Sequence, residues 1–182
     1  MALKMTTNYV EDSIGVFRQY KKLAERAMEQ VKDEDLLAEI DGENNCIAII
    51  VKHMAGNMRS RFQDFLTTDG EKPDRNRDSE FVDPPRTREA LMNMWEAGWA
   101  FVFGALEPLS EADLSRTVKI RGEAHSVMQA IHRQIAHYSY HCGQIVLLAK
   151  HLRSESWKPL TIPKGKSQEY LQRVLAGEAS QR

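Results

Sequence analysis

The stretch Gln134-Ile-Ala-His137-Tyr-Ser-Tyr-His141-Cys-Gly-Gln144 is the part of this chain from which its fold is best inferred. It lies within residues 127–153, where apolar side chains recur every three or four positions, as in a helix with one buried face. Ser126, with Gln129 three residues later, forms a capping box that marks the start of this helix. Two histidines four residues apart lie on one side of a helix, about 40° apart around its axis. Their imidazoles can therefore reach a single point.

A histidine pair of this kind indicates a metal site but does not complete one. Neutral imidazole nitrogens bind a divalent ion at about 2.0–2.1 Å, and catalytic zinc usually has three protein ligands and an open position. His137 and His141 flank the apolar face, where unpartnered nitrogens are costly. A third ligand must come from elsewhere, and His53 is the best candidate. The alternative is that the short H-x-x-x-H pattern is only a packed pair.

His53 belongs to a second predicted helix, residues 45–66. Asn57 and Arg61 follow it at successive steps of four, so the three side chains form one row at the edge of the buried face. Taken alone, His53 is more often a satisfied histidine at the edge of the core. Arg61 is more often solvated or salt-bridged than bound to a substrate. The row matters for function only if it faces the histidine pair.

Three further segments have helical periodicity: residues 8–31, a segment from the cap Thr87 to Leu106, and the short segment 167–175. The second of these is apolar on nearly every side, as in a central helix or one that also meets another subunit. We expect Asn44 or Asn45 to cap the helix that carries His53. The pattern predicts an all-α fold, a four-helix bundle in which metals bind between helices.

The connections between these helices differ in character. Residues 67–86 contain ten charged residues and three prolines among twenty, which predicts a long surface connection that buries little and allows a crossover in the bundle. Residues 116–122 alternate as one short extended segment, a minor addition to a helical protein. Residues 154–182 form a C-terminal extension with the short helix. We expect the whole chain, 1–182, to be one domain.

The composition narrows the class of protein. Charged residues make up 28% and apolar residues 42%, and 25 Lys and Arg against 26 Asp and Glu give a net charge of −1. This balance predicts neither nucleic acid nor an anionic membrane as partner. There is no apolar run of about 18–20 residues, no signal-peptide pattern and no disulfide framework around the two cysteines. We expect a soluble, cytoplasmic protein.

Four motifs occur in order along the chain: Val51-Lys-His53-Met-Ala-Gly-Asn57, Arg-Gly-Glu-Ala-His at 121–125, His137-x-x-x-His141-Cys-Gly-Gln144-Ile and Ile-Pro-Lys-Gly at 162–165. Together they resemble a known family. The chain is similar to the DinB/YfiT-like superfamily over nearly its whole length, and most to an uncharacterised subfamily. The resemblance implies a four-helix bundle, frequent homodimerisation and a three-histidine metal site, often zinc or nickel, with His53, His137 and His141 as ligands.

Characterised relatives in that superfamily include low-molecular-weight-thiol S-transferases and a thiol-dependent isomerase. By analogy we expect a thiol-dependent S-transferase or a related hydrolase, with a thiol co-substrate and a small-molecule substrate. Asn57 and Arg61 are candidates to hold a carboxylate or to orient metal-bound water. Gln144, one turn after His141, is a candidate to hydrogen-bond a metal-binding histidine. Glu96 is the nearest guess for an acid or base. The alternatives are a non-enzymatic metal-binding stress-response bundle and a helical dimerisation module with packed histidines.

Overall fold

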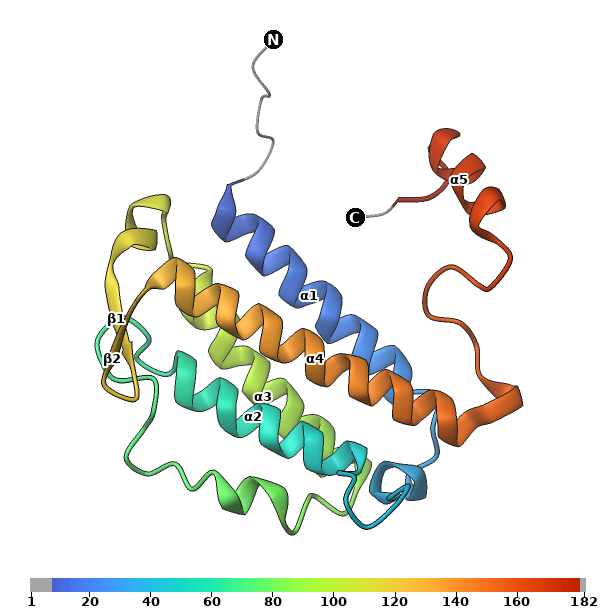
Figure 1. Cartoon of the computed structure of the whole chain (residues 1–182), viewed down its shortest axis with the longest axis horizontal. Coiled ribbons are helices and arrows are strands. Elements are labelled where there is room, and N and C mark those ends of the chain that lie inside the picture. The colour runs from blue at the N-terminus through green and yellow to red at the C-terminus, as the bar shows by residue number, and fades with distance from the viewer. Residues whose placement is uncertain (1–7, 181–182) are drawn as a thin grey trace.

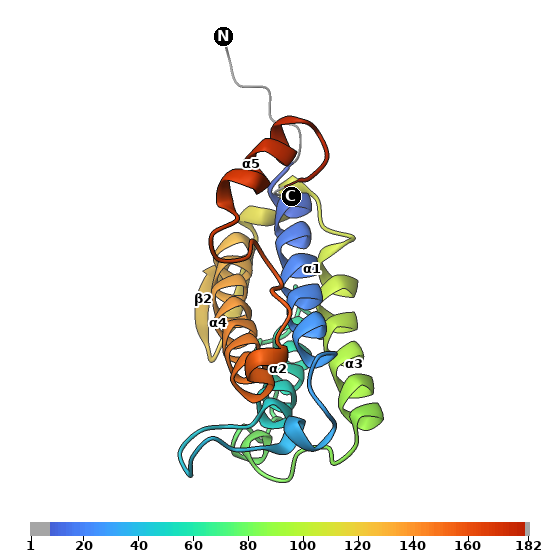
Figure 2. The same ribbon diagram turned by 90° about the vertical axis from the view of Figure 1, so that its right-hand side faces the viewer.

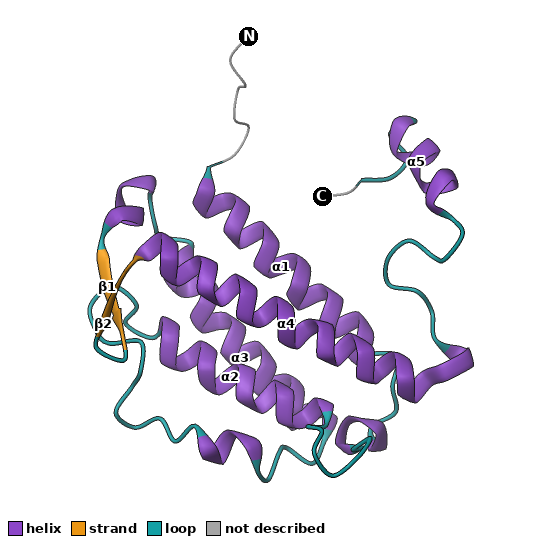
Figure 3. Cartoon of the chain, in the orientation of Figure 1, coloured by secondary structure: helices purple, strands orange, loops and turns teal. Residues whose placement is uncertain are grey.

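Four long helices form the body of the protein, as the computed structural model describes it for residues 8–180 (Figure 1). They are α1 (Tyr9–Met28), α2 (Ile47–Phe62), α3 (Arg88–Leu106) and α4 (Val127–Arg153). The predicted all-α bundle is confirmed, and a two-stranded sheet is the one extended element in this part of the chain (Figure 3). The smaller elements are the 3₁₀ turns η1 (Glu34–Leu37), η2 (Asp78–Phe81), η3 (Glu111–Ser115) and η4 (Ser154–Ser156), the strands β1 (Thr117–Ile120) and β2 (Glu123–Ser126), and α5 (Ser167–Leu175).

The helices pack as two parallel pairs that run in opposite directions. α1 lies beside α4, and α2 lies beside α3 (Figure 1). α2 and α3 can run in the same direction because the connection 67–86 leaves the end of α2 and returns along the bundle to the start of α3. The predicted crossover is therefore present. It places η2 against α2.

α2 is the central helix, with thirteen of its sixteen residues buried. The expectation that the helix ending at Leu106 is central is wrong, because α3 buries one face and leaves Phe101 and Phe103 only half-buried. Gly98 lets α3 approach α2 closely, since a Cβ there would lie 3.0 Å from the Cα of Ala55. The other expectation for α3, contact with another subunit, stays a prediction.

Helix ends follow local signals where a capping side chain is present. The capping box of Ser126 and Gln129 opens α4, and the Thr87 side chain caps α3, as predicted. The prediction that an asparagine caps α2 is wrong. Cys46 occupies the N-cap position and makes no side-chain hydrogen bond there, because hydrogen bonds to Asp41 hold Asn44 in the preceding turn. α2 also ends at Phe62, not at residue 66, because Gln63 is extended and Asp64 has a φ of 49°.

The extended segment predicted at 116–122 is half of a β-hairpin. β1 pairs antiparallel with β2, a second strand that leads directly into α4 and lies outside the predicted segment. Arg121 and Gly122, with φ of 56° and 80°, form the two-residue turn. The carboxylate of Asp69 accepts a hydrogen bond from the backbone amide of each turn residue, at 2.8 and 2.7 Å. The hairpin is thereby attached to the start of the connection 67–86.

The C-terminal extension projects from the bundle, and none of the residues of α5 is buried (Figure 2). The core lies between the four helices, where Phe17, Trp95, Trp99 and Tyr138 are almost fully buried. Among residues 8–180, no helix combines the length and the apolar character that crossing a membrane requires.

Candidate metal centre

The bundle brings the three predicted histidines together. His53 on α2 faces His137 and His141 on α4, and the Nε2 atom of His137 lies 3.4 Å from that of His53 and 3.0 Å from that of His141. One ring nitrogen from each residue lies within 4.8 Å of the other two. His53 is buried, whereas the other two are half-buried. This cluster could hold a metal ion between two helices.

Hydrogen bonds on the far side of two rings determine which nitrogen faces the centre. His53 Nδ1 lies 2.8 Å from Glu80 Oε2, and His141 Nδ1 lies 2.7 Å from Gln144 Oε1. Carboxylate and amide oxygens only accept, so each Nδ1 carries the proton and donates it. In the neutral form of these two rings, Nε2 therefore presents a lone pair toward the centre.

The resulting cluster of nitrogens favours a cation. His137 Nε2 faces both of these lone pairs, and a neutral ring can donate at most one proton to one of them. At least one of the two contacts is then left without a hydrogen bond, whereas an ion between the rings would be bound by the nitrogen lone pairs. Neutral histidines with the outer nitrogen held by a carboxylate or carbonyl are the usual arrangement around a metal. The residues present fit such an ion.

The pKa values of the α4 histidines favour the neutral, metal-binding form. Burial lowers the pKa of His137 to about 3, and the neighbouring His141 and His53 add to the effect. Burial also lowers the pKa of His141, although the hydrogen bond to Gln144 opposes the shift. Protons therefore compete weakly for these two nitrogens at neutral pH.

Glu80 contacts the histidine cluster, and the sequence does not predict this contact. Its side chain is buried, and besides His53 it binds Arg75, with Oε1 2.8 Å from Nε and Oε2 3.0 Å from Nη2. Burial raises the pKa of Glu80, but the hydrogen bonds from His53 and Arg75 bring it below its usual value, so the group is ionised. Gly56 makes room for it, since a Cβ there would lie 2.5 Å from Glu80 Oε1.

Glu80 and Arg75 also correct the expectation that residues 67–86 bury little. The side chains of both are less than a tenth exposed, because they pair with each other against α2. Charged residues that neutralise one another can be buried where isolated ones cannot. No signal in the sequence shows that Glu80 contacts His53, because 27 positions separate the two residues.

The other candidate residues lie around the same centre in different roles. Gln144 holds His141, while the amide oxygen of buried Asn57 accepts a hydrogen bond from Tyr138 at 3.0 Å. Arg61 is buried and binds the carbonyl of Gly70 and the carboxylate of Glu71 at 3.1 Å, so the salt-bridged alternative describes it. Glu96 lies on the surface and binds Lys21 at 2.7 Å, away from the histidines.

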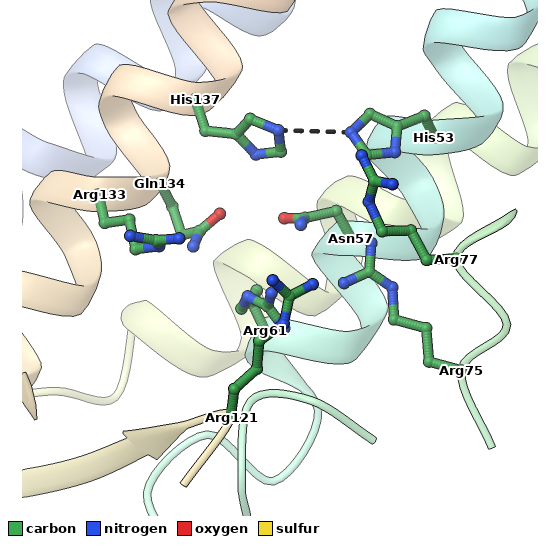
Figure 4. A pocket seen from close by; sticks show the side chains of 9 residues that line it. All are labelled: His53, Asn57, Arg61, Arg75, Arg77, Arg121, Arg133, Gln134 and His137. Atoms are coloured by element: carbon green, nitrogen blue, oxygen red, sulfur yellow. Dashed lines mark hydrogen bonds between the residues drawn. The ribbon is translucent and has the colours of Figure 1, made fainter. Parts of the chain in front are cut away.

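A pocket of about 350 Å³ opens beside the histidines (Figure 4). Two of the three histidines belong to its wall, so a molecule in the pocket would lie next to an ion held by the cluster. Polar and positively charged side chains make up the rest of the wall. The lining residues are His53, Asn57, Arg61, Arg75, Arg77, Arg121, Arg133, Gln134 and His137.

A family model described as a protein of unknown function, DUF1572, matches residues 4–166, which is most of the chain. No curated protein matches the chain, and no solved structure matches it. The chain belongs to the DUF1572 family.

Proposed function

We propose that this protein is a metal-dependent enzyme in which His53, His137 and His141 hold one divalent transition ion, zinc or nickel. The observation that carries the proposal is the convergence of the three Nε2 atoms, two of them with the opposite nitrogen held by Glu80 and Gln144. A divalent ion with an open position supplies Lewis acidity and lowers the pKa of a thiol or water bound there. The resemblance to the DinB/YfiT-like superfamily supports thiol transfer, with hydrolysis as the related reaction.

The thiol in such a reaction would come from a separate molecule. Burial raises the pKa of the Cys142 thiol to about 12, and Cys46 is only 2% exposed. Neither cysteine is part of the three-histidine cluster. A reactive thiolate requires access to solvent, which neither buried site provides. A low-molecular-weight thiol reaching the pocket from solvent fits the site better.

Metal content tests the proposal directly. Elemental analysis by plasma mass spectrometry would compare tag-free wild type with His53→Ala, His137→Ala and His141→Ala. His151→Ala is the matched control, because His151 is exposed near the end of the same helix. We expect about one zinc or nickel ion per chain in the wild type and the control, and loss of the ion in the other three. A wild type that holds no metal and takes up none overturns the proposal.

Enzymatic activity is tested separately from metal binding. A panel of low-molecular-weight thiols with epoxide or halogenated electrophiles should be consumed faster by the metal-loaded wild type than by His141→Ala. The alternative, a non-enzymatic metal-binding bundle, is favoured by the fact that the histidines join two helices, α2 and α4. In that case chelation lowers the melting temperature, but no thiol and electrophile pair is consumed faster than in the His141→Ala protein.

A further inference from the structure

We propose that the pocket beside the three histidines binds a small anionic molecule, through carboxylate or phosphate oxygens held by Arg77 and Arg133. The inference rests on the proposed function, because it names the substrate class of the same site. Figure 4 shows arginine side chains reaching this space from α4, from α2, from the connection 67–86 and from the hairpin turn. Four separate parts of the chain thus bring positive charge to one pocket.

The charge around the pocket is unbalanced within the described residues. Five arginines line it and no carboxylate does. Two carboxylates pair with these arginines from outside the lining: Glu71 contacts Arg61, Arg75 and Arg121, and Glu80 contacts Arg75. Like charges brought together in a half-enclosed space are unfavourable unless an anion joins them. An anionic ligand would supply the missing negative charge.

Arg77 and Arg133 are the arginines left for a ligand. Both are exposed, and across residues 8–180 neither forms an ion pair. The guanidinium of Arg77 lies over the ring of Phe81 at 4.9 Å, and that ring stacks on His53 with centroids 4.7 Å apart. This stack fixes a free positive charge next to a candidate metal ligand. Guanidinium groups bind carboxylate and phosphate oxygens in pairs of hydrogen bonds, which suits both anions.

Two buried polar atoms in the wall are also without a partner. Gln134 is 3% exposed and Arg61 5% exposed, yet Gln134 Oε1 and Arg61 Nε have no hydrogen bond in the described chain. Buried polar groups are nearly always satisfied by protein, water or a ligand. A ligand with an acidic oxygen for Arg61 and a hydroxyl or amine for Gln134 would satisfy both. The volume of about 350 Å³ is at the lower end for ligand sites, which suits a small metabolite better than a polymer.

Calorimetric titration of two probes, inorganic phosphate and succinate, tests the inference at constant ionic strength and pH 7.5. The variants are Arg77→Gln and Arg133→Gln, which remove exposed charges and leave the buried ion pairs intact. Arg173→Gln on α5 is the matched control, because it removes the same charge far from the pocket. We expect one site per chain for at least one probe, about tenfold weaker in each pocket variant and unchanged in the control. The preferred probe tells a phosphate site from a carboxylate site.

The same titrations in metal-loaded and chelated protein separate this inference from the proposed function. If the protein binds the anion but cannot hold a metal, the anion site is supported and only the metal-dependent function is overturned. Metal binding without any anion binding overturns the anion site and leaves the metal centre standing. Equal binding to the wild type and both pocket variants means non-specific association only, and it also overturns the inference.

Discussion

Two oxygen atoms, one from Glu80 and one from Gln144, determine which ring nitrogen of His53 and of His141 faces the centre of the cluster. Gln144 follows His141 by three residues on one helix, so helical geometry alone brings them together. Glu80 reaches His53 only because the connection 67–86 lies against α2. An ionised acceptor makes the ring it holds a stronger electron donor, which is why such partners strengthen metal binding.

Glu80→Gln tests this role. Glutamine retains an oxygen for His53 Nδ1 but removes the charge and the ion pair with Arg75. We expect metal affinity to fall about tenfold, as is typical when a hydrogen-bond partner of a metal-binding histidine is changed. Competition with a chromophoric chelator at pH 7.5 would measure it. Glu89→Gln on the exposed face of α3 is the control, and equal affinities in the two variants would contradict the assigned role.

The two cysteines give a second prediction for single residues. A thiol whose pKa is raised to about 12 is ionised to only about one part in ten thousand at pH 8. Native protein should therefore react slowly with Ellman's reagent, and both thiols should titrate quickly after denaturation in guanidinium chloride. Rapid release of one equivalent from native protein would restore a cysteine of this chain as a candidate nucleophile.

Among the elements, the connection 67–86 has a larger role than its composition indicates. It supplies Glu80 and two of the arginines of the pocket, and at its start Asp69 binds the hairpin turn that presents Arg121. α2 accommodates it through Gly56, whose missing side chain leaves room for the Glu80 carboxylate. A helix-interior glycine normally costs about 0.5–1 kcal/mol relative to alanine, so this one has a packing reason.

Gly56→Ala should therefore behave differently from Gly15→Ala. Gly15 is exposed within α1 and has nothing within 4 Å of an added Cβ, so alanine there should stabilise the protein by about 0.5–1 kcal/mol. At Gly56 the added carbon displaces the Glu80 carboxylate from His53, so we expect no gain in stability and weaker metal binding. Urea unfolding and chelator competition on both variants would measure these effects. An equal gain in stability at both positions would contradict this, because it would show that the Glu80 side chain moves away from the added Cβ without loss of stability.

At the scale of the whole molecule, the metal-free bundle should lose stability as the pH falls. The pKa of His137 is about 3 in the folded chain against 6.5 as its ordinary value. Between these values the unfolded chain binds a proton that the folded chain does not, so the free energy of unfolding decreases toward acid pH. The shift for His141 has the same direction.

We expect roughly 1 kcal/mol less stability at pH 5.5 than at pH 7.5 from His137, a figure discounted for solvent around the half-buried ring. Urea unfolding of chelated protein at both values would measure it, above the range in which ordinary carboxylates titrate. His137→Gln should lose this part of the dependence, whereas His151→Gln should keep it. A wild type equally stable at both pH values would contradict the neutral form of the half-buried His137 ring.

Much of the fold could be predicted from sequence because its signals are local. α4 and α5 begin and end at the predicted residues, since periodicity and the capping box act within one or two turns. The end of α2 was predicted too late because apolar spacing continues to Phe65 after the backbone turns at Asp64. The hairpin was half missed, since strand pairing depends on the partner strand as well as on alternation.

The sequence by itself determined the helical bundle, the histidine pair on α4 and the choice of His53 as their partner. Only the tertiary structure decided that Glu80 holds His53, that α2 is the central helix and that five arginines surround one pocket. The physical reason is separation along the chain. Helix periodicity repeats every few residues. Arg61, Arg121 and Arg133 line one pocket only because α2, the hairpin and α4, which are far apart in the sequence, pack together in the folded chain.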